Sequence, residues 1–410
     1  MKKGIYNSEL ACGHLVLLEN VCERRVEMVD PRREPDKSFR YVDISSVDNS
    51  RKRITASRTI LGREAPSRAR QRIKAGDVLV ATTRPNLNAV AQVPPELDGQ
   101  IASTGFCILR PGEGLDGHYL FAFVQSERFV EDLSDLVKGA LYPAVSDNQV
   151  FSQTLPFPPL PAQRRIAAQL KEQLAEVERT RTALQAQLDA AKALPAASLR
   201  AVFGEPYLHA DWHDLPAITL GQVCDIVARQ VDPKVPAYSS LPHVNGENME
   251  SATRRLMNIR SAAEDGMTSG KYLFEAGDVL YSKLRPYLRK VAVVDFRGLC
   301  SADMYPLRPN KTRLDSDYLA WMLVSDSFTR YAVEESQRAR MPKINRDELF
   351  AWSFRLPPIT VQRTLASRLQ AEITAATELR TALESKLATL DRLPSALLRQ
   401  VFGEASSGKN

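Results

Sequence analysis

Two long stretches of the chain carry apolar residues in a repeat of seven, with alternating gaps of three and four. The first series occupies positions 167, 170, 174, 177, 184, 188 and 191, and the second occupies 366, 369, 373, 376, 383, 387 and 390. This is the seam pattern of a coiled coil, whereas a helix lying on its own globule carries a wider and less regular stripe. The spacing therefore predicts two long helices that pair with each other.

The seam residues expected at this helix–helix contact are Leu170, Leu174, Val177, Leu184, Leu188, Leu369, Ile373, Leu383, Leu387 and Leu390. One slot of each seam is basic, Arg181 in the first and Arg380 in the second. Such long side chains can turn outward to solvent. Glu384 lies one helical turn beyond Arg380 and is a candidate partner for it.

Prolines mark the limits of both predicted helices. Each helix follows a proline-rich segment, PFPPLPAQ or RLPPITVQ, and meets a further proline near its end, Pro195 or Pro394. Proline suits the first turn of a helix but interrupts the interior. The ends read LPAASLRAVFGE (194–205) and LPSALLRQVFGE (393–404). We expect each to form a kink, a short last helix and a stop, with Gly204 or Gly403 in a left-handed cap.

The segments before the helices contain short β-like runs such as DVLVAT, FCILR, DVLYSK and KVAVVDF, separated by Gly, Pro and Asp turns. This pattern is typical of mixed α/β globules. The predicted domains are a first globule over 1–155, a first helix over 156–206, a second globule over 207–355 and a second helix over 356–410.

The two halves of the chain are related copies of each other. Nine of the twelve positions in the two helix ends are identical at an offset of 199 residues. AGDVL recurs unchanged at 75–79 and 276–280, and ILRP (108–111) corresponds to PLRP (306–309). The offset drifts by only a few residues along the chain. The sequence is therefore a tandem duplication of about 200 residues.

The predicted fold class is α+β, with two mixed α/β domains in tandem, each followed by a long helix. The helices are expected to pair as an antiparallel coiled coil with pseudo-two-fold symmetry, which would hold the globules at opposite ends of a rod. At about 1.5 Å per residue, residues 163–194 would span roughly 48 Å, or roughly 14 base pairs of B-DNA. Two globules held so far apart would touch separate segments of one duplex, whose own two-fold axes match such symmetry.

Composition sets further limits on the protein class. A chain of 410 residues with 44% hydrophobic and 25% charged residues is ordinary for a globular protein of two or three domains. No apolar run approaches the roughly 18 to 20 residues of a membrane span, and Asn7, Ser8 and Glu9 interrupt the N-terminus too early for a signal peptide. We therefore expect a cytoplasmic protein without a membrane partner. Five scattered cysteines indicate reduced thiols.

These features together resemble the specificity subunits of Type I restriction–modification systems, over essentially the whole chain. The residues that carry the resemblance are LPFPPLPAQRRIAAQL and RLPPITVQRTLASRL, preceded by YPAVSDNQV and MPKINRDEL, together with the duplicated AGDVL. A proline-rich segment that leads through Gln-Arg into a long helix, occurring twice, is a specific signature of that family. Ala162 and Val361 stand where many members have glutamate, a departure on which the start of the helix does not depend.

The resemblance implies a non-catalytic subunit with two target recognition domains, each reading one half of a bipartite, asymmetric site in double-stranded DNA. It implies that the two helices set the spacing and dock two modification (methyltransferase) subunits. Restriction subunits, with translocase and nuclease activity, would join that core. S-adenosylmethionine, ATP and magnesium would belong to these partners, so no cofactor is expected in this chain.

Charge within the first globule is concentrated in one stretch. Residues 51–84 contain ten Lys or Arg against two acidic residues, whereas 1–155 as a whole hold 21 basic and 20 acidic residues. Such a concentration is typical of a surface that follows phosphates, although a solvated loop is the alternative. The second globule has weaker versions in SKLRPYLRK (282–290) and QRARMPKINR (337–346), and TTRPNLN (82–88) is the counterpart of SKLRPYL.

The candidate DNA-binding residues are those that can contact phosphates or base edges, since Arg and Lys suit phosphate and guanine while Asn suits adenine. In the first globule they are Arg51, Lys52, Arg53, Arg58, Arg63, Arg68, Arg70, Arg72, Lys74, Thr83, Arg84, Asn86 and Asn88. In the second they are Lys283, Arg285, Tyr287, Arg289, Lys290, Arg338, Arg340, Lys343 and Arg346.

Some motifs have a structural alternative. The repeated Arg-Pro (84–85 and 285–286) either presents arginines to bases or is a turn element that orients a loop, and the sequence leaves both open. The Gly-Asp of AGDVL is expected to be scaffold. His209 and His213 have helical spacing but no supporting ligand cluster, so no metal site is expected. No catalytic residue is expected either, because amino-methyltransferase, glycine-rich cofactor and phosphate-loop motifs are missing from the sequence.

Two other functional classes remain open at this point. A stand-alone DNA nuclease or methyltransferase with an unrecognised motif would show turnover without partners. A coiled-coil scaffold that binds only protein would show no salt-dependent retention of DNA, because phosphate contacts weaken steeply with salt.

Overall fold

The computed structural model describes residues 14–139, 141–204, 214–336 and 342–403. The chain divides into two compact units: unit 1 comprises Met1–Gln185 and Ser385–Asn410, and unit 2 comprises Ala186–Glu384. Each unit therefore combines one globule with the first part of the helix that follows it. Each also contains the last part of the helix from the other half of the chain.

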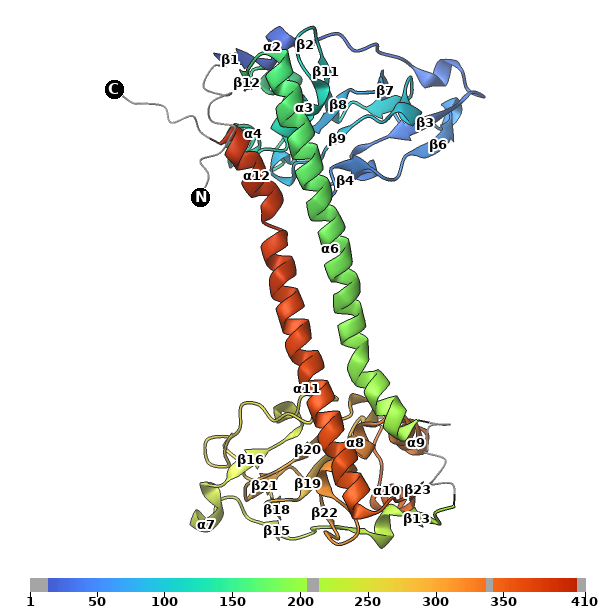
Figure 1. The fold of residues 1–410 in the computed structure, drawn as a ribbon, viewed down its shortest axis with the longest axis vertical. Coiled ribbons are helices and arrows are strands. Elements are labelled where there is room, and N and C mark those ends of the chain that lie inside the picture. The colour runs from blue at the N-terminus through green and yellow to red at the C-terminus, as the bar shows by residue number, and fades with distance from the viewer. Residues whose placement is uncertain (1–13, 140, 205–213, 337–341, 404–410) are drawn as a thin grey trace, which may run out of the picture. The chain divides into compact units, whose positions relative to one another are not determined.

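Unit 1 is built on two four-stranded sheets (Figure 1). The first is antiparallel, in the order β2 (Cys22–Glu23), β11 (Phe106–Pro111), β8 (Val78–Ala81) and β9 (Val90–Gln92). The second has the order β6 (Arg58–Leu61), β3 (Ser38–Val42), β10 (Ile101–Ser103) and β7 (Ala69–Arg72), with β3 and β10 parallel. Two short antiparallel pairs accompany them, β1 (His14–Leu17) with β12 (Thr154–Phe157) and β4 (Val47–Asp48) with β5 (Arg53–Ile54).

Strand β8 shows why the run VLVA is apolar throughout. Side chains alternate between the two faces of a strand, and both faces of β8 are covered. Val78 and Val80 belong to the larger core of unit 1, whereas Leu79 and Ala81 belong to a second, separate core. A strand buried on both sides has no position left for a polar side chain.

Unit 2 repeats the plan of unit 1. Its antiparallel sheet has the order β14 (Cys224–Ile226), β22 (Met304–Pro309), β19 (Val279–Ser282) and β20 (Val291–Val293). Its second sheet has the order β15 (Gln230–Val231), β18 (Lys271–Phe274), β21 (Gly298–Cys300), β16 (Pro242–Val244) and β17 (Arg260–Ser261), again with one parallel pair, β21 and β16. β13 (Ala217–Thr219) pairs with β23 (Ser353–Arg355).

Short helices pack against each antiparallel sheet. In unit 1 they are α2 (Leu18–Val21), α3 (Gly117–Val124), α4 (Glu127–Asp135) and α5 (Asp147–Phe151), and in unit 2 they are α8 (Ser316–Val324), α9 (Asp326–Ser336) and α10 (Arg346–Ala351). The short helix α7 (Pro236–Ser239) lies instead beside the second sheet of unit 2, where Tyr238 packs against the cluster that contains Val231 and Leu273. An aspartate caps the corresponding helices α3 and α8. Asp116 Oδ1 accepts a hydrogen bond from Tyr119 N at 3.0 Å, and Asp315 Oδ1 accepts one from Tyr318 N at 3.1 Å.

A buried glutamine fastens each long helix to its globule. The first helix is α6 (Leu160–Phe203), and the second consists of α11 (Ile359–Leu390) and α12 (Leu393–Phe402). Gln163 is fully buried; its Oε1 accepts from Asp116 N at 2.9 Å, and its Nε2 donates to the carbonyls of Pro158 and Gly114 at 2.9 and 3.1 Å. Gln362 makes the same three contacts in unit 2, at 2.8–2.9 Å. The Gln-Arg motif is therefore an anchor that sets the direction of the helix.

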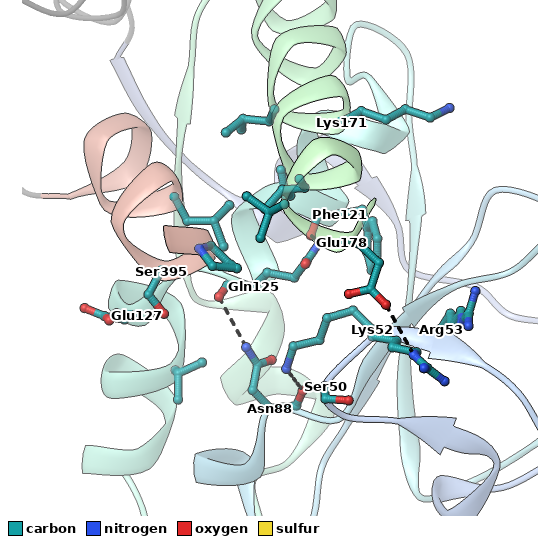
Figure 2. A pocket seen from close by; sticks show the side chains of 18 of the residues that line it. Ser50, Lys52, Arg53, Asn88, Phe121, Gln125, Glu127, Lys171, Glu178 and Ser395 are labelled. Carbon is teal, nitrogen blue, oxygen red and sulfur yellow. Dashed lines mark hydrogen bonds and ion pairs between the residues drawn. The ribbon is translucent and has the colours of Figure 1, made fainter. Parts of the chain in front are cut away.

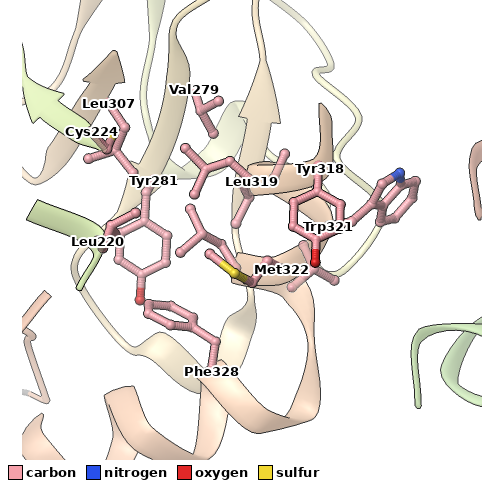
Figure 3. Close-up of a cluster of buried hydrophobic side chains, with 14 of the residues drawn as sticks. Leu220, Cys224, Val279, Tyr281, Leu307, Tyr318, Leu319, Trp321, Met322 and Phe328 are labelled. Atoms are coloured by element: carbon pink, nitrogen blue, oxygen red, sulfur yellow. The ribbon is translucent and has the colours of Figure 1, made fainter. Parts of the chain in front are cut away.

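The core of each unit is completed by a helix end from the other half of the chain. In unit 1, Phe402 of α12 packs against Tyr119 and Phe123 with ring centroids 5.3 and 5.6 Å apart, and Figure 1 shows α12 beside α4. In unit 2, Phe203 of α6 lies 5.3 Å from the ring of Tyr318, next to the cluster of buried side chains drawn in Figure 3. The repeated VFGE ending thus supplies a core residue.

The two helical segments within unit 1 run antiparallel. Leu170, near the start of α6, shares a core with Leu398 of α12, while Arg181, further along α6, forms an ion pair with Asp391 at 3.4 Å. Moving forward along one helix therefore means moving backward along the other. The predicted fold class is confirmed: two mixed α/β domains in tandem, each followed by a long helix, with antiparallel helix pairing. The predicted domain limits stay a prediction, and the compact units divide both helices within their length.

The seam residues are buried to different degrees. Leu170, Leu188, Leu369, Ile373, Leu383 and Leu390 are buried, and Leu174, Val177, Leu184 and Leu387 are half-buried. Of the two basic slots, Arg380 is exposed and pairs with Glu384 at 3.9 Å, whereas Arg181 is half-buried and pairs with Asp391.

The last short helix is separate in one copy only, which corrects the expectation for the other. α6 continues through Pro195 as one helix of 44 residues, whereas α11 ends at Leu390 and α12 starts anew at Leu393. The residues before the proline explain the difference. Copy one has Ala-Lys-Ala, which are strong helix formers, and copy two has Asp391-Arg392, in which aspartate favours a turn.

The glycines of VFGE do not form left-handed caps, so that expectation was wrong. Gly403 has φ −64° and ψ 157°, an extended conformation. It is glycine for a steric reason, because a Cβ at this position would lie 2.3 Å from the carbonyl oxygen of Arg399. A Cβ at Gly204 would lie 2.5 Å from the corresponding oxygen of Arg200.

The described cysteines are free and buried: Cys22, Cys107, Cys224 and Cys300. Burial raises the pKa of the Cys22 thiol to about 12, so that it stays protonated and unreactive at neutral pH. In the part of the chain that the structure describes, no helix has both the length and the apolar character needed to cross a membrane.

Candidate nucleic-acid interface

The Arg-Pro motif forms the same strained turn in both units. After β8 and after β19 the chain enters a single 3₁₀ turn, η4 (Pro85–Leu87) or η9 (Pro286–Leu288). Arg84 and Arg285, which precede these turns, have φ +50° and +51°, in the left-handed region. Non-glycine residues there carry strain of about 1–3 kcal/mol each. Because the same strain is retained at matching positions of both units, the turn is a candidate functional element.

Backbone contacts hold this turn in place. Arg84 N donates to the carbonyl of Pro143 at 2.8 Å, and Arg285 N donates to that of Pro342 at 2.8 Å. The prolines of the motif are buried. The turn-element interpretation of Arg-Pro is therefore correct. The other interpretation, in which these arginines are presented to DNA bases, stays a prediction, because both residues are exposed.

The candidates on and around the turn divide into exposed side chains and anchors. Asn86 and Tyr287 are exposed, and Thr83 is half-buried. Asn88 donates to the carbonyl of Gln125 at 3.3 Å, and Arg289 pairs with Asp326 at 2.6 Å, so both of these fasten the turn to neighbouring helices. Their candidacy for DNA contact stays a prediction.

Much of the basic stretch 51–84 is neutralised within unit 1. The ion pairs are Arg51 with Asp48 and Glu178, Arg58 with Asp43, Arg63 with Asp36, Arg70 with Asp30 and Arg72 with Glu27, at 2.7–3.8 Å. The hydrogen bond from Arg70 holds the pKa of Asp30 below its usual range. Exposed pairs of this kind contribute little to stability, so a phosphate could compete for their arginines. Arg53, Arg68, Lys74 and Arg84 are exposed and have no ion pair with any described residue.

Lysines near the two turns are used to hold backbone carbonyls. Lys52 has φ +52° and its Nζ donates to the carbonyl of Asn88 at 2.6 Å. Burial lowers the pKa of Lys52 to about 8. In unit 2, Lys283 donates to the carbonyl of Ala302 at 2.5 Å and Lys290 to that of Gly246. Burial also lowers the pKa of Lys283. These residues support the loops rather than reach into solvent.

The remaining candidates of unit 2 come from the segment before and within α10. Lys343 is exposed, and the guanidinium of Arg346 lies 5.5 Å from the ring centroid of Phe350. Arg338 and Arg340 lie outside the described residues, as do His209 and His213. Among the described residues there is no group of three or more side chains suited to hold a metal ion.

A groove of about 950 Å³ lies beside the turn of unit 1 (Figure 2). Its walls are the β4–β5 hairpin, η4, helices α3 and α4, and the paired segments of α6 and α12. Figure 2 shows Lys52 and Arg53 on one side and Lys171 above them. Two of the half-buried seam residues, Leu174 and Val177, line the groove, which is why the neighbouring helix does not cover them.

The corresponding place in unit 2 is filled by Arg254, a residue that the sequence did not single out. Arg254 stands at the position of Lys52 and also has a left-handed backbone, with φ +63°. Its side chain is 7% exposed, pairs with Asp317 and lies 4.2 Å from the ring centroid of Trp321. In unit 1 an alanine, Ala122, corresponds to Trp321. The missing ring and the missing guanidinium together leave the groove open.

The Gly-Asp turns of AGDVL are scaffold, as expected. Gly76 and Gly277 have φ +90° and +92°, which glycine tolerates best. The buried carboxylate of Asp77 makes two hydrogen bonds of 2.8 Å to the guanidinium of Arg110. Asp278 does the same with Arg308 at 2.7 Å. In each unit, the AGDVL motif therefore supplies the aspartate and the LRP motif supplies the arginine of an ion pair that links neighbouring strands.

Comparisons with known proteins agree with this architecture. No family model matches the chain. Over 181 residues it is 32% identical to the Type I restriction enzyme EcoDI specificity subunit of Escherichia coli, an alignment covering 44% of this chain and 40% of that protein. Over 361 residues it is 21% identical to the Type I restriction enzyme StySPI specificity subunit of Salmonella potsdam, covering 81% and 75%. The first alignment thus spans less than half of that relative.

Solved structures extend the likeness over the full length. The HsdS subunit from Thermoanaerobacter tengcongensis is 31% identical with a TM-score of 0.69, covering 98% of this chain and 99% of that one. A chain from a study of complex assembly and conformational transition of the type I R-M system is 32% identical with a TM-score of 0.70, covering 95% and 97%. The chain belongs to the specificity (HsdS) subunits of Type I restriction–modification systems.

Proposed function

We propose that the chain recognises a bipartite, asymmetric site in double-stranded DNA, one half with the globule of each unit. The observation that carries this proposal is the strained Arg-Pro turn, which occurs at the same place in both units with an exposed arginine. The residues around the two turns differ, with TTRPNLN in one and SKLRPYL in the other. One scaffold with two different surfaces suits two different half-sites.

The chain would act as a non-catalytic partner of enzymes. It would dock two modification subunits along its helices, and restriction subunits would join them. The groove of unit 1 supports docking, because it leaves Leu174 and Val177 accessible to an apolar helix face. S-adenosylmethionine, ATP and magnesium would be bound by these partners. Labelled S-adenosylmethionine or plasmid with magnesium should therefore give no turnover with the purified chain alone.

Methylome sequencing tests the proposal. The chain is expressed with its modification partner in a host that lacks other methyltransferases, with the partner alone as the control. The expected result is one split, asymmetric methylated motif that requires this chain. A continuous motif, or the same motif from the partner alone, would refute the proposal.

A further inference from the structure

Two large apolar side chains stand in water on the loop between α4 and α5. Leu141 is 89% exposed and Tyr142 is 83% exposed, more than any other large hydrophobic residue in the described ranges. Single exposed apolar residues are common on protein surfaces and need no explanation. Two adjacent ones at the tip of a loop are an unfavourable arrangement for an isolated chain, and such arrangements mark binding sites.

The loop that carries them is fastened at its far side. Pro143 follows Tyr142, and its carbonyl accepts the hydrogen bond from Arg84 N at 2.8 Å. Val145 N donates to the carbonyl of Thr82 at 2.8 Å, and Val145 itself is buried in the core. The apolar pair therefore projects from a fixed position beside the strained Arg84 turn.

The surroundings of the pair favour nucleic acid over an apolar protein surface. Arg84, joined to the loop through its backbone, is exposed and has no ion pair within the described residues. Asn86 is exposed on the same turn. An apolar and aromatic tip flanked by a cation and an amide matches DNA, where cations hold phosphates while apolar side chains enter between bases.

We propose that Leu141 and Tyr142 form an apolar wedge that enters one base step of the half-site read by unit 1. This inference rests on the proposed function and adds to it the way in which that half-site is deformed. Inserted apolar side chains partly unstack a step and bend the duplex, and the deformation favours sequences that unstack easily. The wedge would thus select sequence without a hydrogen bond to a base edge.

The wedge belongs to one half-site. Unit 2 has the same scaffold, in which Arg285 N donates to the carbonyl of Pro342 at 2.8 Å and Ile344 N donates to that of Lys283 at 3.1 Å. The positions that correspond to Leu141 and Tyr142 are Arg340 and Met341 in the sequence, outside the described residues. A basic residue in place of the leucine predicts a different contact there, so the unstacking should be confined to the half-site of unit 1.

The test uses the complex of the full chain with its modification partner and duplexes that contain the methylated motif. 2-Aminopurine is placed at successive positions of each half-site, and its fluorescence reports unstacking on binding. We expect an increase at one step of one half-site, lost in the double variant Leu141→Ala/Tyr142→Ala. The same variant should bind roughly 5- to 150-fold more weakly, the range observed when a base-stacking side chain is removed.

Two controls separate a wedge from a general defect. The variant Leu15→Ala/Met28→Ala removes exposed apolar side chains from other parts of unit 1 and should leave both fluorescence and affinity unchanged. A mismatched pair at the affected step costs less energy to unstack, so it should restore the binding of the wedge variant to within a few-fold of the native complex. Both double variants should melt at the temperature of the native chain, because the replaced side chains are exposed.

The possible failures are distinct. If the wedge variant binds the split site with native affinity and the fluorescence change persists, the wedge is refuted while the proposed function stands. If the variant loses its modification partner instead of its DNA affinity, the pair is a protein contact and the wedge is again refuted. If the native complex shows no preference for a split site, the proposed function fails and the wedge fails with it.

Discussion

At the scale of single residues, the unusual features of the chain occur in matched pairs. Gln163 and Gln362 anchor the long helices, and the ion pairs of Asp77 and Asp278 link neighbouring strands, each with the same geometry in both units. A pattern that is duplicated down to hydrogen-bond partners belongs to the scaffold. The residues that differ between copies, such as Asn86 and Tyr287, are the better candidates for reading different bases.

The anchor residue gives a direct stability prediction. Replacing Gln163 by Leu removes three hydrogen bonds at a fully buried site and leaves the amide of Asp116 and two carbonyls without a partner. Unsatisfied buried groups of this kind should cost about 3 kcal/mol in total. Urea unfolding should show this loss, whereas Gln169→Leu, at an exposed position of α6, should change the free energy of unfolding by less than about 0.5 kcal/mol.

Lys52 predicts a pH dependence with a definite sign. Its pKa is lowered by burial from 10.5 to about 8, so the unfolded chain binds more protons than the folded chain between these values. The contribution of Lys52 to the free energy of unfolding should therefore rise with pH across this window and be lost as pH falls through 8. Unfolding curves at pH 7 to 10.5 should show this rise for the native chain and for Lys74→Met, at an exposed lysine, but not for Lys52→Met. Equal pH slopes for all three proteins would contradict the assignment.

At the scale of elements, each globule is completed by a helix end encoded in the other half of the chain. Phe402 lies in the core of unit 1, and Val202 lies in the core of unit 2. The final turns of each long helix are therefore part of a hydrophobic core as well as part of the helix pair. This explains why the sequence LP…LR.VFGE is retained in both copies.

The exchanged helix ends can be tested because all three tryptophans, at positions 212, 321 and 352, fall within the range of unit 2. Phe402→Ala should destabilise unit 1 by about 3–5 kcal/mol through the cavity left between Tyr119 and Phe123. Far-UV circular dichroism, which follows both units, should then show an early unfolding phase that tryptophan fluorescence does not report. Gln400→Ala, at an exposed position of α12, is the control. An equal shift in both signals would mean that the helix end does not belong to unit 1 alone.

Periodicity and repetition made the elements and the contact between the helices predictable from sequence, but not the way in which each helix end completes the core of the other unit. The heptads predicted the helices and their antiparallel contact, and the repeat predicted two like units. The failures have local causes. The proline interrupts the helix in the second copy, where Asp391 precedes it, but not in the first copy, where the preceding turn is rich in alanine. Gly403 is required because a Cβ at its position would lie 2.3 Å from the carbonyl oxygen of Arg399. No pattern indicates such contacts in advance.

The candidate site was predictable in composition and less so in arrangement. The basic stretch 51–84 was evident, but its ion pairs with Asp30, Asp36 and Glu178 come from distant segments and halve the number of free cations. Arg254 gave no signal because an Arg-Arg pair in a loop (254–255) is ordinary in a sequence. Tyr142 belongs to the motif YPAVSDNQV, but neither it nor Leu141 was predicted to contact DNA, because their significance is exposure, which a sequence does not show.

At the scale of the whole molecule, we propose that the two helices set the distance between two domains that read DNA. The heptad seam allows this to be tested without disturbing either reader. One extra heptad inserted after residue 184 and another after residue 383 keep the seam in phase. Seven residues lengthen each helix by about 10.5 Å, which corresponds to roughly 3 base pairs of B-DNA.

Methylome sequencing of this double insertion, expressed with the modification partner, is the most direct test. We expect the native half-sites, unchanged at every base, separated by a spacer that is about three base pairs longer. A single insertion, in one helix only, disturbs the pairing of the seam and should abolish the motif. An unchanged spacer, or altered half-sites with the native spacer, would contradict the claim that the helices hold two separate DNA readers apart.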